Sequence, residues 1–243
     1  MSKKVINQNT NYNTELLDSI GSNFIFNENP INRIKNEREA FSKNPIGKKI
    51  NKDQELSELR KQIGLIENCI LKDNSKNIVL GDGNINSPIM LIGEAPGDEE
   101  DQTGGVFLGE VGNLLKKMLI AINIKIENIY CTYAVNFRPP GNRKPSTIEI
   151  KRYAVFLQKH ISIIKPKIII LMGSTAMESL TGLNSKISNE RGKWKEVIIK
   201  NINYNVIITF SPSYLLRAPE NKKHSWQDLK KIKQKIVQLK LLI

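Results

Sequence analysis

The chain has few cysteines and no long hydrophobic run. Only two of its 243 residues are cysteine, Cys69 and Cys131, and their wide separation argues against a disulfide framework or a self-contained metal site. No apolar stretch approaches the roughly 18–20 residues that a membrane-spanning helix needs. The polar start MSKKVINQNTNYNTE lacks the apolar core of a secretory signal. These absences predict a cytoplasmic protein that does not enter a membrane.

Acidic residues are outnumbered by basic ones, 24 against 37, which gives a net charge of +13. Such a charge favours a polyanionic partner, either a nucleic acid or an anionic membrane surface. Only eight of the 37 basic residues are arginine, and a biased genome composition would produce the same abundance of lysine without any binding role. The positions of the arginines are more informative. Four of them fall in loops that carry other distinctive residues: Arg138, Arg143, Arg191 and Arg217.

The length allows one sizeable α/β domain with an appendage. Residues 1–52 are rich in Asn and Lys and predict a polar N-terminal extension with some helix, followed by a domain over 53–243. Apolar spacing predicts helices at 53–71 and 111–122, from a capping box at Ser146 to Pro166, and at about 222–242. Strands are expected at 77–80, 89–92, 128–134, 167–172, 196–200 and 204–209. This alternation predicts a mainly parallel sheet with helices on both faces.

One segment stands out because it combines acidic residues, glycines and one aromatic residue directly after an apolar run. It reads GEAPGDEEDQTGGVFLGEVG from Gly93 to Gly112 and follows the expected strand at 89–92. The chain therefore turns at Gly93 and presents Glu94 at the carboxyl end of a strand. In open α/β sheets that edge is where ligands bind, so we expect a functional site there.

Four motifs in sequence resemble the uracil-DNA glycosylase superfamily, and family 4 most closely. They are GEAPGDEED, GGVFLGEVGNLL, RPPGNRKPS at 138–146 and SPSYLLRAP at 211–219, and the similarity runs from about residue 69 to the C-terminus. The resemblance implies a three-layer fold with four parallel central strands and DNA-binding loops at one edge. It also implies a monomeric enzyme of base-excision repair that hydrolyses the N-glycosidic bond of uracil or another deaminated base in DNA.

The resemblance assigns candidate roles to residues of these motifs. Phe107 would stack on the extruded base, with a core phenylalanine as the alternative. Glu94 would stabilise positive charge on the sugar or hold the attacking water, with a cap for the following helix or a lysine partner as the alternative. Gly93, Ala95 and Tyr133 would line the base. Asp101 is expected to be structural and to anchor a turn through backbone hydrogen bonds.

DNA contacts are expected from the later motifs. Two guanidinium groups on a rigid proline-rich backbone suit the clamping of phosphates, although a plain turn with exposed arginines is the competing interpretation. The expected DNA-binding residues are Arg138, Asn142, Arg143, Tyr214 and Arg217. The last helix carries seven lysines, which are more simply read as a solvated face.

The first departure from the family concerns its four-iron four-sulfur cluster, which four cysteines hold. Only Cys69 matches a ligand position, because Phe137 and Tyr153 stand at two of the others and Cys131 lies in the preceding strand. We therefore expect no cluster and no other metal. Packing of the two aromatic rings, worth a few kcal/mol each at ~25 cal/mol per Å², would take over its structural role, as in cluster-free relatives.

Two further departures lie in the expected base pocket. Tyr133 stands where the family reads the edge of uracil with an asparagine, so selectivity for uracil is in doubt. Asn136, three residues on, should face the opposite side of the strand. Ser211 stands where the family has a histidine that donates to the uracil carbonyl, and loss of one such donor typically costs ~2.7–4 kcal/mol of transition-state stabilisation.

Two other functions follow from these observations. A catalytically degenerate relative would keep the fold and the DNA affinity but lose the chemistry at Tyr133 and Ser211. A small-molecule nucleotide-binding enzyme would use the glycine-rich turn for phosphate, but no GK[ST] follows the glycines and the Rossmann spacing is absent.

Overall fold

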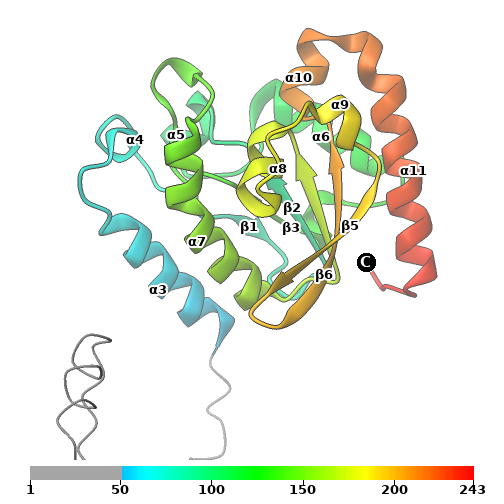
Figure 1. The fold of residues 1–243 in the computed structure, drawn as a ribbon, viewed down its shortest axis with the longest axis horizontal. Helices are drawn as coiled ribbons and strands as arrows, with labels where there is room; N and C mark the ends of the chain where they lie inside the picture. The colour runs from blue at the N-terminus through cyan, green and yellow to red at the C-terminus, as the bar shows by residue number, and fades with distance from the viewer. Residues whose placement is uncertain (1–50) are drawn as a thin grey trace, which may run out of the picture. The chain divides into compact units, whose positions relative to one another are not determined.

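The computed structural model describes residues 51–243, and their centre is one six-stranded sheet with the order β1-β3-β2-β4-β6-β5 (Figure 1). The predicted polar extension over 1–52 lies almost entirely outside the described residues. No described helix is both long enough and apolar enough to cross a membrane. The strands are β1 (Asp82–Gly83), β2 (Ile89–Gly93), β3 (Tyr130–Tyr133), β4 (Ile168–Met172), β5 (Trp194–Ile199) and β6 (Ile202–Thr209).

The four central strands β3, β2, β4 and β6 run parallel. Leu91 pairs with Cys131 on one side and with Ile170 on the other, and Ile170 in turn pairs with Ile207. Every residue of β2, β3 and β4 is buried, as expected for a parallel sheet that is covered on both faces. The two edge strands, β1 and β5, are antiparallel to their neighbours.

Alternate side chains of the strands feed two separate cores, which gives the fold three layers. Met90 and Ile92 pack with helices α3, α7 and α8, whereas Ile89 and Leu91 pack with α6, α10 and α11. The larger helices are α3 (Lys52–Gly64), α6 (Gly109–Ile120), α7 (Thr147–Ile164), α8 (Ser174–Thr181) and α11 (Lys222–Gln238). The short ones are α4 (Ile70–Asp73), α5 (Asp98–Thr103), α9 (Ile187–Glu190) and α10 (Pro212–Arg217). The predicted fold class is confirmed.

Three predicted elements are wrong in extent or kind. The segment 77–80 is not a strand, because the Val79 N–H and carbonyl bond to the carbonyl and side-chain amide of Asn136 instead of a neighbouring strand. The helix expected over 53–71 ends at Gly64, and Asn68 has a left-handed φ of 50°, so Ile70 begins a separate turn and is 64% exposed. The last helix ends at Gln238 rather than near 242.

Candidate functional site

A cavity of about 480 Å³ lies where the parallel strands end. The last residues of β2, β3 and β4, which are Gly93, Tyr133 and Met172, line it together with Phe210 directly after β6. Arg138 is the one predicted site residue that does not line it. The predicted residues that do line it are Gly93, Glu94, Ala95, Phe107, Tyr133, Asn142, Arg143, Ser211, Tyr214 and Arg217. The geometry therefore brings the first and last motifs to one hollow.

Glu94 caps a helix that begins 80 residues further along the chain. Its Oε1 accepts a hydrogen bond of 3.1 Å from the Thr175 N–H at the start of α8, and Ser174 Oγ lies 3.5 Å away. Gly173 has a φ of 100°, and a Cβ there would lie 2.3 Å from the Glu94 Cδ, so the close approach requires glycine. The helix N-terminus stabilises the carboxylate and fixes it beside the cavity.

Ser211 is the N-cap of α10. Its Oγ accepts the Tyr214 N–H at 3.3 Å and lies 3.1 Å from the Ser213 Oγ. The Ser211 residue is only 6% exposed, but it lines the cavity. Both predicted catalytic residues, Glu94 and Ser211, thus also hold a helix end in place.

Phe107 and Tyr133 form a tilted aromatic pair at the cavity wall, with ring centroids 4.8 Å apart. Phe107 has a left-handed φ of 50°, which the Tyr133 hydroxyl supports by accepting its N–H at 2.9 Å. Phe107 is 3% exposed and belongs to one of the two cores, so it lines the cavity while it is also packed inside. The core position of Phe107 is thus compatible with a place in the cavity wall, and its stacking on a base stays a prediction.

Glu100 is a buried member of the site that the sequence did not single out. One carboxylate oxygen accepts the Gly97 N–H at 3.0 Å, and the other accepts the Leu108 N–H at 2.9 Å and the Tyr133 hydroxyl at 3.3 Å. Burial and the Glu100 charge raise the pKa of Tyr133 well above its usual 10.0, so the phenol stays neutral. Asp101 accepts the N–H groups of Lys76 and Asn77, which confirms its predicted structural role.

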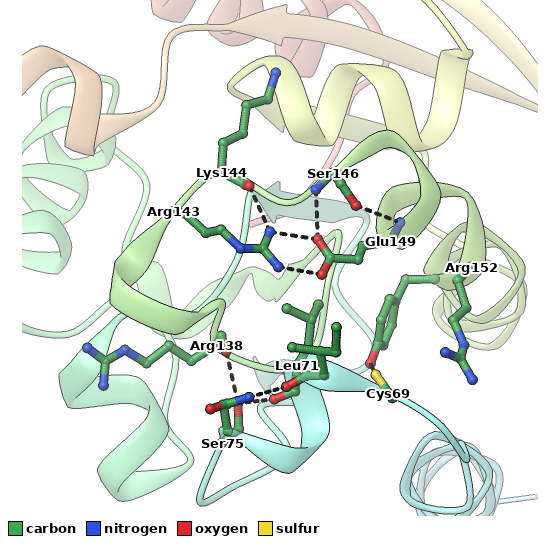
Figure 2. A network of polar contacts seen from close by, with 12 residues as sticks. Cys69, Leu71, Ser75, Arg138, Arg143, Lys144, Ser146, Glu149 and Arg152 are labelled. Atoms are coloured by element: carbon green, nitrogen blue, oxygen red, sulfur yellow. Dashed lines mark hydrogen bonds and ion pairs between the residues drawn. The ribbon is translucent and has the colours of Figure 1, made fainter.

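Both arginines of the RPPGNR loop are engaged by acidic side chains of the chain itself. Arg143 forms a two-point pair with Glu149, at 2.6 and 2.8 Å, and Glu149 also accepts the Ser146 N–H (Figure 2). The hydrogen bond from Arg143 lowers the pKa of Glu149 from 4.5 to about 2. Arg138 pairs with Asp98 and donates to Asn142 at 2.8 Å. These guanidinium groups stiffen the loop.

Two other cations at the cavity are exposed. Arg217 and Lys144 line the hollow, and neither forms a salt bridge with any residue in the described range. Arg191, the fourth arginine noted in the sequence, does not line the cavity. It pairs instead with the buried Asp228, and its guanidinium lies 5.6 Å from the centroid of the Phe210 ring.

The residues at the family's cluster positions do not fit an iron–sulfur cluster. Cys69 and Cys131 are the only cysteines, both are buried and free, and such a cluster needs more thiolates than two. Cys69 Sγ lies 3.3 Å from the Tyr153 hydroxyl, and the Tyr153 ring meets Phe137 edge to face. Residues 51–243 contain no group of three or more His, Cys, Asp or Glu side chains placed to hold a metal ion.

The fold, the cavity and the motifs agree with the comparison to known families. The model of the uracil DNA glycosylase superfamily matches residues 80–230, which include every strand found within residues 51–243 and the whole cavity wall. The chain belongs to this superfamily. Similar proteins are the type-4 uracil-DNA glycosylases of Thermotoga maritima, 39% identical over 63% of this chain and 79% of that protein, and of Archaeoglobus fulgidus, 32% identical over 74% and 92%. That of Pyrobaculum aerophilum is 31% identical over 72% of this chain and 91% of its own length.

Proposed function

We propose that this chain is a DNA glycosylase of base-excision repair that hydrolyses the N-glycosidic bond of uracil or another deaminated base in DNA. The observation that carries this proposal is that Glu94, Phe107 and Ser211 line the same cavity, at the carboxyl ends of the parallel strands. A nucleotide swung out of a duplex needs a hollow of this kind, with an aromatic wall and polar groups at its end.

The chemistry follows from the charges that develop when the bond between base and sugar breaks. Positive charge grows on the sugar, and the Glu94 carboxylate, held by the Thr175 N–H, is placed to stabilise it or to orient water. Negative charge grows on the departing base, and the Ser211 hydroxyl is the donor in place of the family's histidine. A serine donor is shorter and weaker than a histidine donor. We therefore expect the rate constant of excision to be about 10²–10³ times lower than that of an enzyme with the histidine.

DNA would be bound through the cations at the mouth of the cavity. Arg217 and Lys144 are exposed, and Tyr214 lies on the same helix as Arg217. Arg143 and Arg138 would act mainly by holding the loop in shape, since each already has an acidic partner. The net charge of +13 adds long-range attraction to the phosphate backbone.

The cluster of the family would be absent from this chain. The Cys69, Phe137 and Tyr153 contacts support a cluster-free member in which side-chain packing ties α4 to α7. Action as a monomer and a cytoplasmic location stay predictions from the sequence.

The test is an excision assay on oligonucleotides that contain uracil, hypoxanthine or xanthine, followed by alkali to break the strand at abasic sites. We expect slow but measurable strand breaks from at least one substrate at enzyme excess. Glu94→Gln, which keeps the size of the side chain and removes its charge, should abolish them while DNA binding persists. No strand breaks from any substrate would reject catalysis.

A second candidate function is a catalytically degenerate DNA-binding relative. It is favoured by one observation: Glu94 and Ser211 are both used as helix caps, and the histidine donor is absent. This function predicts DNA binding that weakens steeply with salt and no excised base, so any measured excision rejects it.

A further inference from the structure

The Phe107 ring, on which a base would stack, already packs against another aromatic side chain of the protein. Tyr133 packs on the Phe107 ring, and only 4% of Tyr133 and 3% of Phe107 remain exposed. Gly93 leaves no spare room beside them, since a Cβ at Gly93 would lie 2.8 Å from both the Phe107 Cζ and the Tyr133 Cδ1. A base that stacks on the same face of Phe107 must take the place of the Tyr133 ring.

The hydroxyl of Tyr133 also uses the polar groups of this wall. It accepts the Phe107 N–H at 2.9 Å and donates to Glu100 at 3.3 Å. The imide edge of uracil has one N–H donor between two carbonyl acceptors, so a hydroxyl that accepts once and donates once matches one carbonyl and the N–H. The phenol therefore reproduces the stacking and part of the hydrogen-bond pattern of a pyrimidine. Its raised pKa keeps the hydroxyl proton available for the Glu100 bond at neutral pH.

We propose that Tyr133 is a built-in substitute for the nucleobase, and that the cavity in this form takes a nucleotide that has lost its base, an abasic deoxyribose in DNA. This inference rests on the proposed function only in assuming that the cavity receives an extruded nucleotide. A nucleotide that carries a base enters the slot only after Tyr133 leaves it.

The remaining part of the cavity suits such a ligand. Beyond Tyr133 its lining includes the polar groups Glu94, Ser174, Ser211 and Ser213 and the exposed Arg217, together with the aromatic side chains Phe210 and Tyr214. The polar groups can bond to the hydroxyl and carbonyl oxygens of a sugar, and the guanidinium can bond to its flanking phosphate. The position on Phe107 is thus filled by Tyr133, whereas these polar groups stay available to a sugar.

The test compares three duplexes that differ at one position: a tetrahydrofuran abasic analogue, uncleavable 2′-fluoro-2′-deoxyuridine, and thymidine. Equilibrium binding of the full chain is followed by fluorescence anisotropy. We expect the wild-type chain to bind the abasic duplex at least about tenfold more tightly than the uracil duplex. Equal affinity for these two duplexes would overturn the proposal without any variant.

An abasic nucleotide is also easier to extrude, so the dependence of the preference on Tyr133 is decisive. Tyr133→Asn and the apolar Tyr133→Leu should both reduce the abasic preference by about tenfold, through tighter binding of the uracil duplex. The matched control Tyr133→Phe keeps the ring and should keep the preference. An unchanged preference in the folded Asn and Leu variants would overturn the proposal.

This experiment and the excision assay fail independently. A Tyr133-dependent abasic preference without excision of any base would keep this inference and remove the proposed catalysis. Excision by a wild-type chain that shows no abasic preference would keep the proposed catalysis and reject this inference.

Discussion

Arg191 and Asp228 form a buried ion pair, with Arg191 Nη2 and Nε at 2.6 and 2.9 Å from the two carboxylate oxygens. Asp228 on α11 also accepts the Thr209 hydroxyl at the end of β6. The guanidinium lies over Phe210, the residue between β6 and the α10 cap Ser211. One fully buried carboxylate thus ties a surface helix to the strand end that carries the SPSYLLRAP loop.

Asp228→Ala should destabilise the fold strongly. It leaves Arg191 without its partner in a largely buried position, and breaking a buried pair in this way typically costs about 3–5 kcal/mol. Urea unfolding followed by circular dichroism measures the loss. The control Glu127→Gln removes an exposed carboxylate and should change the free energy of unfolding by less than about 0.5 kcal/mol. Similar values for the two variants would mean that the pair contributes little.

The buried His160 should make the fold less stable as the pH falls below neutral. Burial lowers its pKa from 6.5 to about 3, and its Nε2 lies 2.9 Å from the Tyr130 hydroxyl. Between these two pH values the unfolded chain binds a proton that the folded chain does not. Folding stability should therefore drop by up to about 1.4 kcal/mol per pH unit from this residue.

His160→Gln checks this sign, because it removes the titrating group. The stability of the variant, measured by thermal unfolding from pH 7 to pH 4, should depend less on pH than that of the wild type. Tyr130→Phe removes the partner hydroxyl and keeps the imidazole, so the wild-type dependence should persist there. Parallel pH curves for His160→Gln and the wild type would show that the imidazole does not govern this range.

The sequence was sufficient for the four central parallel strands because their signals are local, but it did not predict the edge strand β1. Continuous apolar runs such as 89–92 and 167–172 mark parallel strands, and the motifs that follow them must meet at one edge. The segment 77–80 has the same apolar character, but its backbone is satisfied by Asn136, 57 residues away. A bond across such a distance leaves no trace in local periodicity.

The electrostatic arrangement of the site could not be predicted for the same reason. Glu94 caps a helix at Thr175, 81 residues on, and Arg191 meets Asp228 across 37 residues. Glu100 sits inside a recognisable acidic motif, yet its bond to Tyr133 depends on how two loops fold together. Sequence motifs identified which residues share the cavity, whereas their partners follow from the tertiary structure.

Restoring the family residues should raise uracil excision. Ser211→His supplies the missing donor, and Tyr133→Asn opens the slot on Phe107, so the double variant should gain about 10²–10³ in single-turnover rate. Loss of the Ser211 cap should cost about 1 kcal/mol of stability. The control variant combines Ser213→His with Tyr133→Asn, so that the histidine stands two residues after position 211. This control should show no gain in the single-turnover rate. A double variant that is no faster than the wild type would count against the proposed alignment of these positions.

Arg217 and Arg143 should affect DNA binding in different ways, although both line the cavity. Arg217 is exposed and makes no salt bridge within residues 51–243. Arg217→Ala should therefore make the negative slope of log affinity against log salt shallower by about 0.9, for one lost phosphate contact. Arg143 is held by Glu149, so Arg143→Ala should reduce the melting temperature and change the slope much less. Binding titrations at several salt concentrations measure both slopes. If Arg143→Ala changes the slope as much as Arg217→Ala, Arg143 must leave Glu149 and contact a phosphate in the complex.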